Sequence, residues 1–150
     1  MPPIIKKECM LFHMEAANKL EAIRQMTEVF DKEGYLENKD LFQKDVLDRE
    51  NVFSTYIGYG IGLPHGKSNG VKEAGLCIAR LDRPVIWAEE TGNEVSLIIM
   101  IAVNNEGAGD LHLQILSKLS RLLMHEEFRT ELISGNEEDV YQVLEKRLEV

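Results

Sequence analysis

A single histidine, His65, follows a run of alternating glycines in residues 57–66, which read IGYGIGLPHG. Glycine has no Cβ, so main-chain N–H groups in such a segment can approach a bound group closely. Pro64 stiffens the approach to the histidine, and Gly66 would let the chain turn sharply after it. The segment could therefore present an imidazole to a partner and surround it with backbone donors. The plainer interpretation is a tight turn with a surface histidine. A second histidine, His112, favours the interpretation in which the segment presents His65 to a partner.

His112 comes after an apolar run, residues 95–103, which is rich in β-branched residues and bounded by turn residues. We expect this run to be a strand buried on both faces, and Asp110 to cap the helix that carries His112 in its first turn. Ligands of open α/β sheets gather at the carboxyl edge, and a helix N-terminus favours an anion. If His65 lies at the same edge, the two imidazoles could meet. Taken alone, His112 could equally be a half-buried histidine that a backbone partner satisfies.

Phosphoryl transfer through a phosphohistidine is the chemistry that these groups suit. An imidazole is largely neutral near pH 7, so His65 could attack phosphorus without a base. The transition state is loose and in-line, so catalysis consists mostly of positioning and electrostatic stabilisation. His112 and backbone N–H groups near the glycines would contact the phosphoryl oxygens, and Arg49 could add charge stabilisation. Arg49 could equally be no more than a C-terminal arginine on the dipole of its helix.

The segment resembles the active-site signature of the enzyme IIA proteins of the fructose/mannitol class, which belong to the bacterial phosphoenolpyruvate-dependent sugar phosphotransferase system. The matching positions are Thr55, Ile57, Gly58, Gly60, Ile61, Gly62, Pro64, His65 and Gly66. The family usually has alanine at the position of Gly62. Arg49-Glu50 matches an Arg-Glu pair of the family, and His112-Leu113 matches its histidine–leucine pair. The resemblance extends from about Asn18 to the last helix, and residues 112–123 are more similar to the fructose type.

This resemblance implies a phosphotransferase that accepts a phosphoryl group on His65 from the phosphocarrier protein HPr and passes it to the enzyme IIB component of a sugar permease. His112 and Arg49 would assist the transfer, and Thr55, Gly60, Gly62 and Gly66 would bind the phosphate. No metal or cofactor is needed, because protein groups hold the phosphoryl group at both ends. The alternative is a regulatory module of the nitrogen-related branch, whose partner binding depends on phosphorylation of His65.

Composition excludes several other classes. The 150 residues suit a single domain spanning 1–150, and the longest apolar run is far shorter than the roughly 18 residues of a membrane span. No secretory signal is visible, and Cys9 and Cys77 have no metal-like spacing, so we expect a cytoplasmic protein with reduced thiols. The net charge of −9 disfavours nucleic acid and anionic membranes as partners and suits a partner with a basic face. A zinc hydrolase would need a third ligand, and no histidine or cysteine spacing in the sequence supports one. A dinucleotide-binding loop would continue into a helix, whereas here Pro64, Gly66 and Gly70 follow the glycines.

Periodicity and capping residues predict one α/β domain with a mixed, mostly parallel sheet flanked by helices. Helices are expected to start at Asn18, Asn38 and Asn136, with another in residues 127–133. A strand is expected at residues 74–81, with Leu76 and Ile78 on one face and Cys77, Ala79 and Leu81 on the other. After a turn at residues 82–84, a short edge strand is expected at residues 85–87.

Overall fold

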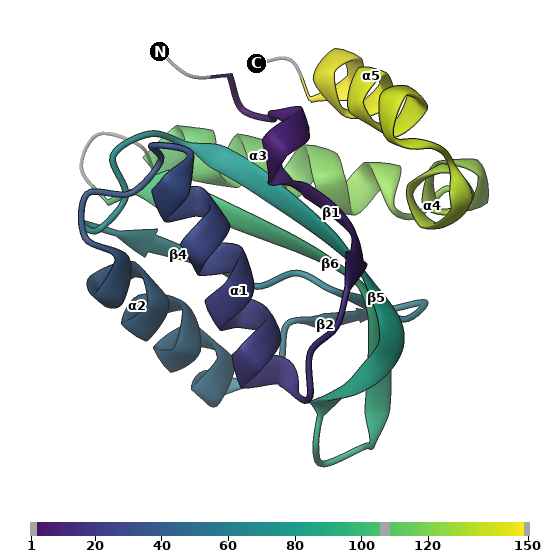
Figure 1. Ribbon diagram of the computed structural model, residues 1–150, viewed down its shortest axis with the longest axis horizontal. Coiled ribbons are helices and arrows are strands. Elements are labelled where there is room, and N and C mark those ends of the chain that lie inside the picture. Colours follow the sequence, from purple (N-terminus) through teal and green to yellow (C-terminus); the bar gives the residue numbers. More distant parts are fainter. Residues whose placement is uncertain (1–2, 106–108, 149–150) are drawn as a thin grey trace.

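A β-sheet lies between two layers of helices in the computed structural model of the chain (Figure 1). The structure describes residues 3–105 and 109–148, without the side chains of residues 109–112. Within these residues, a short 3₁₀ helix, η1 (Lys7–Cys9), precedes the first strand, and five α-helices follow along the chain. The α-helices are α1 (Lys19–Lys32), α2 (Lys39–Val52), α3 (Gly109–Leu122), α4 (Glu126–Ser134) and α5 (Glu137–Arg147).

The sheet has the order β1-β5-β6-β3-β2, with β4 also paired to β6. Its strands are β1 (Met10–Met14), β2 (Tyr56–Gly58), β3 (Ile61–Gly62), β4 (His65–Ser68), β5 (Gly75–Ala88) and β6 (Asn93–Asn104). The pairs β1–β5, β3–β6 and β4–β6 are parallel, whereas β2–β3 and β5–β6 are antiparallel. The predicted α/β class and mixed sheet are confirmed.

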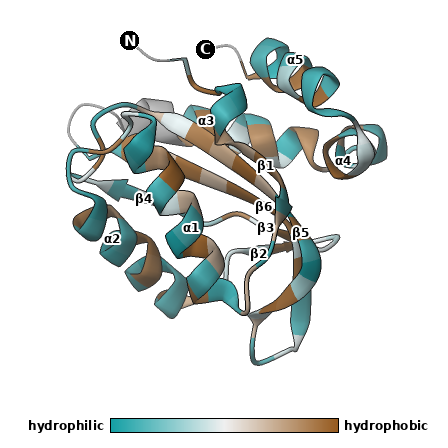
Figure 2. Cartoon of the chain, in the orientation of Figure 1, coloured by the Kyte–Doolittle hydropathy of each residue, from teal (hydrophilic) through white to brown (hydrophobic). Residues whose placement is uncertain are grey.

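Strand β6 separates two apolar cores, as expected of a strand buried on both faces. Its side chains alternate between the core under α3, α4 and α5 and the core under α1 and α2. Strand β5 alternates in the same way, with Leu76 and Ile78 in the first core and Cys77, Ala79 and Leu81 in the second, as predicted. In Figure 2 much of β5 and β6 is coloured hydrophobic, as expected of strands covered on both faces.

Asparagine side chains begin three of the helices, and all three positions were predicted. The Oδ1 atoms of Asn18, Asn38 and Asn136 accept the backbone N–H three residues later, at 2.9, 3.1 and 2.8 Å. Each bond satisfies one of the N–H groups that the first helical turn leaves without an intrahelical partner. Helix α3 begins at Gly109, so Asp110 lies within the helix rather than before it; its side chain is among those not described.

The predicted turn at residues 82–84 is wrong, because β5 runs through it without a break. The pairing with β6 shifts its register between Arg80 and Val85, as at a β-bulge, and Pro84 lies exposed in the shifted part. A proline there needs no N–H for the ladder, so the strand can continue. The predicted edge strand is therefore the far end of β5, which pairs with the beginning of β6.

Arg80 of β5 holds the C-terminal end of α4 against the sheet. Its Nε donates to the carbonyl of Leu132 at 2.8 Å, and its Nη2 donates to the carbonyl of Gly135 at 2.7 Å. The guanidinium carbon also lies 3.8 Å from the ring centroid of Phe12. The last carbonyls of a helix have no intrahelical donors, so a cation placed here satisfies them and complements the helix dipole.

Arg80→Ala should destabilise the protein, because it leaves these carbonyls without donors. We expect a loss of about 2 kcal/mol in the free energy of unfolding, which for a chain of this size corresponds to a fall of roughly 4–8 °C in Tm. Thermal unfolding followed by circular dichroism measures the effect. Arg83→Ala is the matched control, since Arg83 is an exposed arginine of the same strand. Equal melting temperatures for the two variants would contradict the role of Arg80.

Candidate functional site

His65 is the first residue of β4 rather than part of a loop. It pairs with Ile101 of β6, and side chains of paired residues in parallel strands point to the same face. Ile101 belongs to the core that α3 covers, so the imidazole lies on the α3 side of the sheet. Pro64 separates β3 from β4, and its carbonyl accepts the N–H of Ile101 at 3.0 Å. Gly66 is likewise extended within β4, so the sharp turn predicted there is wrong.

The ring of His65 is held in one tautomer by the backbone two residues earlier. Its Nδ1 lies 2.7 Å from the carbonyl oxygen of Leu63. Because a carbonyl can only accept, Nδ1 carries the hydrogen, and in the neutral ring Nε2 carries the lone pair. Leu63 is itself fixed, since its N–H donates to the carbonyl of Thr55 at 3.1 Å. In this tautomer Nε2 is the ring nitrogen that could act as a nucleophile.

The surroundings of His65 lower the pKa of its imidazole. Burial of the half-buried ring is the main cause, and the positive charge of Arg49 acts in the same direction. The hydrogen bond to Leu63 and the negative charge of Glu50 act in the opposite direction without cancelling it. The neutral, nucleophilic form is thus favoured.

The rate at which His65 accepts a phosphoryl group should consequently stay constant to a lower pH than for an ordinary histidine. An ordinary histidine titrates at about pH 6.5, whereas here the rate should fall only as pH drops through the lowered pKa. Titration of the ring followed by ¹⁵N NMR, beside the pH dependence of the rate, measures this. Arg49→Gln removes a cation and should raise the pKa. A midpoint at or above pH 6.5 in the wild-type protein would contradict the expectation.

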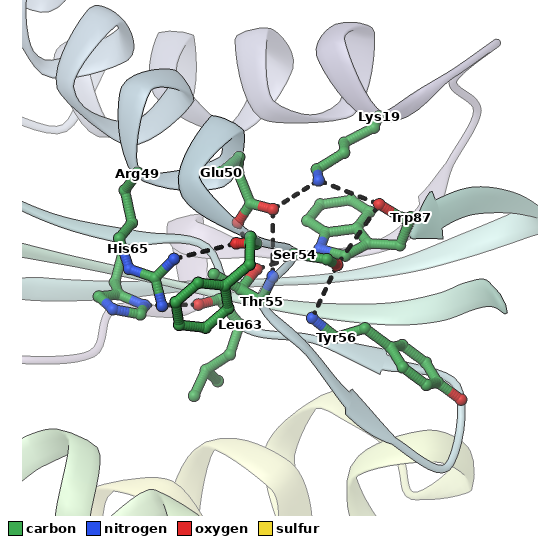
Figure 3. Close-up of polar contacts among 10 residues, drawn as sticks. Lys19, Arg49, Glu50, Ser54, Thr55, Tyr56, Leu63, His65 and Trp87 are labelled. Atoms are coloured by element: carbon green, nitrogen blue, oxygen red, sulfur yellow. Dashed lines mark hydrogen bonds and ion pairs between the residues drawn. The ribbon is translucent and has the colours of Figure 1, made fainter. Parts of the chain in front are cut away.

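Arg49 lies in the last turn of α2, close enough for its charge to act on His65. Its Nη1 donates to the carbonyl of Phe53 at 3.0 Å, and its guanidinium carbon lies 4.5 Å from the centroid of the Phe53 ring. Figure 3 shows the guanidinium between the end of α2 and the imidazole. Two residues predicted from the sequence, Arg49 and His65, are thus brought together by the fold.

Thr55 lies in a largely buried polar cluster beside this pair, together with Glu50, Lys19 and Trp87 (Figure 3). Its hydroxyl donates to Glu50 Oε2 and accepts from Trp87 Nε1 at 3.0 Å, while its N–H donates to Glu50 Oε1 at 3.2 Å. Lys19 Nζ pairs with Glu50 Oε1 at 2.5 Å and donates to the carbonyl of Trp87 at 3.0 Å. These contacts give Thr55 a supporting role, and phosphate binding by Thr55 stays a prediction.

The glycines do not form the continuous segment around His65 that the sequence suggested. Gly58 and Gly60 have positive φ values of 100° and 73° and make the tip of the β2–β3 hairpin. The Gly60 carbonyl accepts the N–H of Leu97, four residues before the partner of His65 on β6, or about 13 Å along the strand. The tip is therefore distant from the imidazole, because the segment is extended between the two.

Packing requires a glycine at position 62 but not at position 66. A Cβ on Gly62 would lie 2.8 Å from the indole of Trp87, whereas a Cβ on Gly66 would lie 3.4 Å from Val46 of α2, which is an ordinary van der Waals contact. Strand β3 thus approaches the indole closely, and β4 approaches α2 closely. Phosphate binding by Gly60, Gly62 and Gly66 stays a prediction.

His112 is the fourth residue of α3, which follows the carboxyl end of β6. Its side chain lies outside the described residues, so its contact with His65 stays a prediction. The backbone favours that contact, since α3 covers the face of the sheet on which His65 lies.

Glu50 was named from the sequence only as part of the Arg-Glu pair, and its buried, supporting place in this site was not predicted. It follows Phe42 and Val46 at intervals of four residues, on the stripe of α2 that faces the core. A carboxylate on an otherwise apolar stripe was a visible signal, because a buried charge needs partners. Among the described residues, no group of three or more histidine, cysteine or acidic side chains is arranged to hold a metal ion. No helix in the described part of the chain is long and apolar enough to cross a membrane.

Comparison with known proteins finds one protein family across almost the whole chain. The family model for "Phosphoenolpyruvate-dependent sugar phosphotransferase system, EIIA 2" matches residues 3–147. The chain is 34% identical to multiphosphoryl transfer protein 2 of Escherichia coli over 99% of its own length and 18% of that protein. It is 35% identical to the fructose-specific EIIABC component of Bacillus subtilis, covering 91% of this chain and 21% of that protein. The chain thus spans about a fifth of the length of these relatives.

Other relatives are similar over their full length. The mannitol-specific enzyme IIA component of Geobacillus stearothermophilus is 34% identical, with 95% of each chain covered. The crystal structure of the nitrogen regulatory protein IIA-Ntr from Neisseria meningitidis superposes with a TM-score of 0.82 at 27% identity, covering 97% of both chains. The mannitol enzyme IIA of Escherichia coli, solved in complex with phosphorylated enzyme IIB, superposes with a TM-score of 0.77 at 28% identity, covering 93% of this chain and 96% of that one.

Proposed function

Because the chain belongs to the EIIA 2 family of the phosphoenolpyruvate-dependent sugar phosphotransferase system, we propose that it carries a phosphoryl group on Nε2 of His65 between two protein partners. The observation that carries the proposal is the hydrogen bond from Nδ1 to the carbonyl of Leu63, which leaves the lone pair on Nε2. The lowered pKa of the ring keeps this nitrogen unprotonated at neutral pH.

In the proposed step, Nε2 attacks the phosphorus of a phosphohistidine on the donor. A new N–P bond forms on His65 as the N–P bond of the donor breaks, and the donor imidazole leaves with the electron pair. No proton has to be removed, because Nδ1–H stays bonded to Leu63 throughout. Arg49 adds positive charge beside the transferred group, whose oxygens carry the negative charge of a loose transition state. In transfer to the acceptor, a nucleophile of the acceptor forms its bond to phosphorus as the N–P bond on His65 breaks, and Nε2 recovers its electron pair.

We propose HPr as the donor and an enzyme IIB component as the acceptor, both in the cytoplasm. A relative in this family, the mannitol enzyme IIA of Escherichia coli, has been solved with phosphorylated enzyme IIB. Exposed apolar side chains beside the site support docking of a protein rather than of a small molecule. Val52 and Phe53, next to Arg49, are 71% and 65% exposed, and Leu113, next to His112, is 63% exposed.

A regulatory role is the second candidate, and the structural similarity to IIA-Ntr is the observation that favours it. Sugar transport has the stronger support, because the mannitol enzyme IIA component matches at 34% identity with 95% of both chains covered. The identities of the fructose and mannitol relatives are nearly equal, so we propose a permease of the fructose/mannitol class without choosing between the two sugars.

Radiolabel transfer tests the proposal. The protein is incubated with ³²P-labelled phosphoenolpyruvate, enzyme I and HPr, and then with purified enzyme IIB components. We expect an acid-labile, base-stable label, as a phosphoramidate gives, which a fructose-type or mannitol-type IIB removes. Labelling without transfer to any such IIB would favour the regulatory candidate, whereas no labelling in the presence of phosphorylated HPr would refute the carrier role.

A further inference from the structure

The buried carboxylate of Glu50 gathers three donors from two other parts of the chain. The side chain is 3% exposed, and it accepts from Lys19 Nζ, from the N–H of Thr55 and from the hydroxyl of Thr55. Lys19 opens α1, Glu50 ends the buried stripe of α2, and Thr55 precedes β2. One carboxylate thus ties the start of α1 to the segment that leads into the active-site strands.

An unbroken series of hydrogen bonds continues from this carboxylate to the active-site imidazole. The carbonyl of Thr55 accepts the N–H of Leu63 at 3.1 Å, and the carbonyl of Leu63 lies 2.7 Å from Nδ1 of His65. Thr55 is 5% exposed and is also held by the indole N–H of Trp87 at 3.0 Å. The position of the Leu63 carbonyl, and with it the tautomer of His65, depends on where Thr55 is held.

We propose that Glu50 is a positioning residue for phosphoryl transfer: through Thr55 and Leu63 it holds His65 as the Nδ1–H tautomer, with Nε2 directed to the partner. The inference rests on the proposed function of His65 as phosphoryl acceptor. Glu50 itself does not touch the transferred group. Arg49 and Glu50, which are adjacent in sequence, therefore divide two tasks, since Arg49 supplies charge beside the imidazole and Glu50 fixes the main chain that orients it.

A carboxylate is required at position 50, because the three donors need both of its oxygens as acceptors. A glutamine at position 50 has one carbonyl oxygen, which cannot occupy the places of both Oε1 and Oε2. If this oxygen faces Lys19 and the N–H of Thr55, the amide NH₂ meets a hydroxyl that has lost its acceptor. If the amide is reversed, the NH₂ meets two donors. In either orientation a buried donor is left unsatisfied, and Thr55 is no longer held in one place.

Four variants test the proposal. Glu50→Gln removes the charge, Thr55→Val removes the hydroxyl at nearly constant shape, and Thr55→Ser keeps the hydroxyl. Asp48→Asn is the matched control, since Asp48 is a carboxylate of the same helix that pairs on the surface with Lys44 at 2.8 Å. Two quantities are measured for each variant: the tautomer of His65, from long-range ¹H–¹⁵N NMR spectra of the unphosphorylated protein, and the rate of phosphoryl acceptance from phosphorylated HPr.

We expect Glu50→Gln and Thr55→Val to raise the population of the Nε2–H tautomer and to slow acceptance about tenfold to a hundredfold, chiefly in kcat, because misplacement of a nucleophile by about 1 Å has effects of this size. Asp48→Asn should match the wild type in both measurements, and Thr55→Ser, which keeps the hydroxyl, should lose much less than Thr55→Val in both. A merely structural role would lower Tm without changing the tautomer of the folded protein. If Glu50→Gln fails to fold, the comparison of Thr55→Val with Thr55→Ser decides the matter.

The proposal is overturned if folded Glu50→Gln or Thr55→Val keeps the wild-type tautomer, or if the tautomer changes while the rate does not. An equal loss in Asp48→Asn would also overturn it, since any carboxylate of α2 would then suffice. The tautomer is measured without a phosphoryl donor. Failure of the wild-type protein to accept phosphate would therefore count against the proposed function, whereas an unchanged tautomer would count against Glu50.

Discussion

His65→Ala is expected to abolish phosphoryl acceptance while leaving the fold intact. The substitution removes the nitrogen on which the new N–P bond forms, and no other group can replace it at the end of the hydrogen-bonded series from Thr55. The structural loss is small, because the ring is only half-buried and a hydrogen bond such as the one to Leu63 contributes modestly to stability. We expect a decrease of about 1 kcal/mol in the free energy of unfolding, so the variant should still unfold cooperatively.

Incubation with phosphorylated HPr, followed by tandem mass spectrometry under neutral or basic conditions, measures the site and extent of labelling. His13→Ala is a suitable control, since the His13 side chain is 88% exposed and lies on β1, away from the β4 edge. It should accept phosphate at the wild-type rate. Phosphate on Ser68, on Thr55 or on another histidine of the wild-type protein would contradict the assignment to His65.

His112→Ala should slow phosphoryl transfer by about 10²–10³ without preventing it. His112 lies in the first turn of α3, where backbone N–H groups and the helix dipole already favour a phosphate. Since α3 covers the face of the sheet on which His65 lies, a donor at this position would stabilise the phosphorylated state more than the free one. His112→Gln should lose less activity, because an amide N–H remains a donor.

Rapid-quench measurement of acceptance from HPr and of transfer to enzyme IIB determines both steps for these variants. Thermal unfolding should accompany the kinetics, because the sequence places His112 on the apolar stripe of its helix. Transfer at the wild-type rate by His112→Ala would disprove a role in catalysis. Complete loss of phosphorylation, equal to that of His65→Ala, would instead make His112 an essential acceptor or relay.

Local sequence was enough to predict those helices and strands whose start or burial depends on residues close together in the chain. An asparagine that accepts an N–H three residues later starts a helix by itself, and Asn18, Asn38 and Asn136 all do so. The apolar run at residues 95–103 could be satisfied only between two covered faces, so the sequence also placed β6 in the middle of the sheet. The motif around His65 likewise indicated the family, which the family model confirms.

The neighbourhood of His65 was only partly determined by sequence. Arg49 was a candidate because it precedes the glycine-rich segment and matches the family's Arg-Glu pair, and the fold does bring its charge to the imidazole. The glycines were misjudged, because glycine allows both a turn and a close approach in an extended strand, and the sequence does not distinguish them. Gly66 is extended because it pairs with Ala102 of β6, and Gly62 lies where the indole of Trp87 leaves no room for a Cβ.

Tertiary structure alone decided what supports the imidazole. Lys19, Glu50 and Trp87 are distant in sequence, and they meet at Thr55 only because α1, α2 and β5 pack around the segment before β2. A local pattern can show that Glu50 lies on a buried stripe, but the partners of a buried charge come from other elements. The tautomer of His65 depends on these long-range contacts, because the carbonyl that holds Nδ1 is positioned by Thr55 and not by the residues next to the histidine.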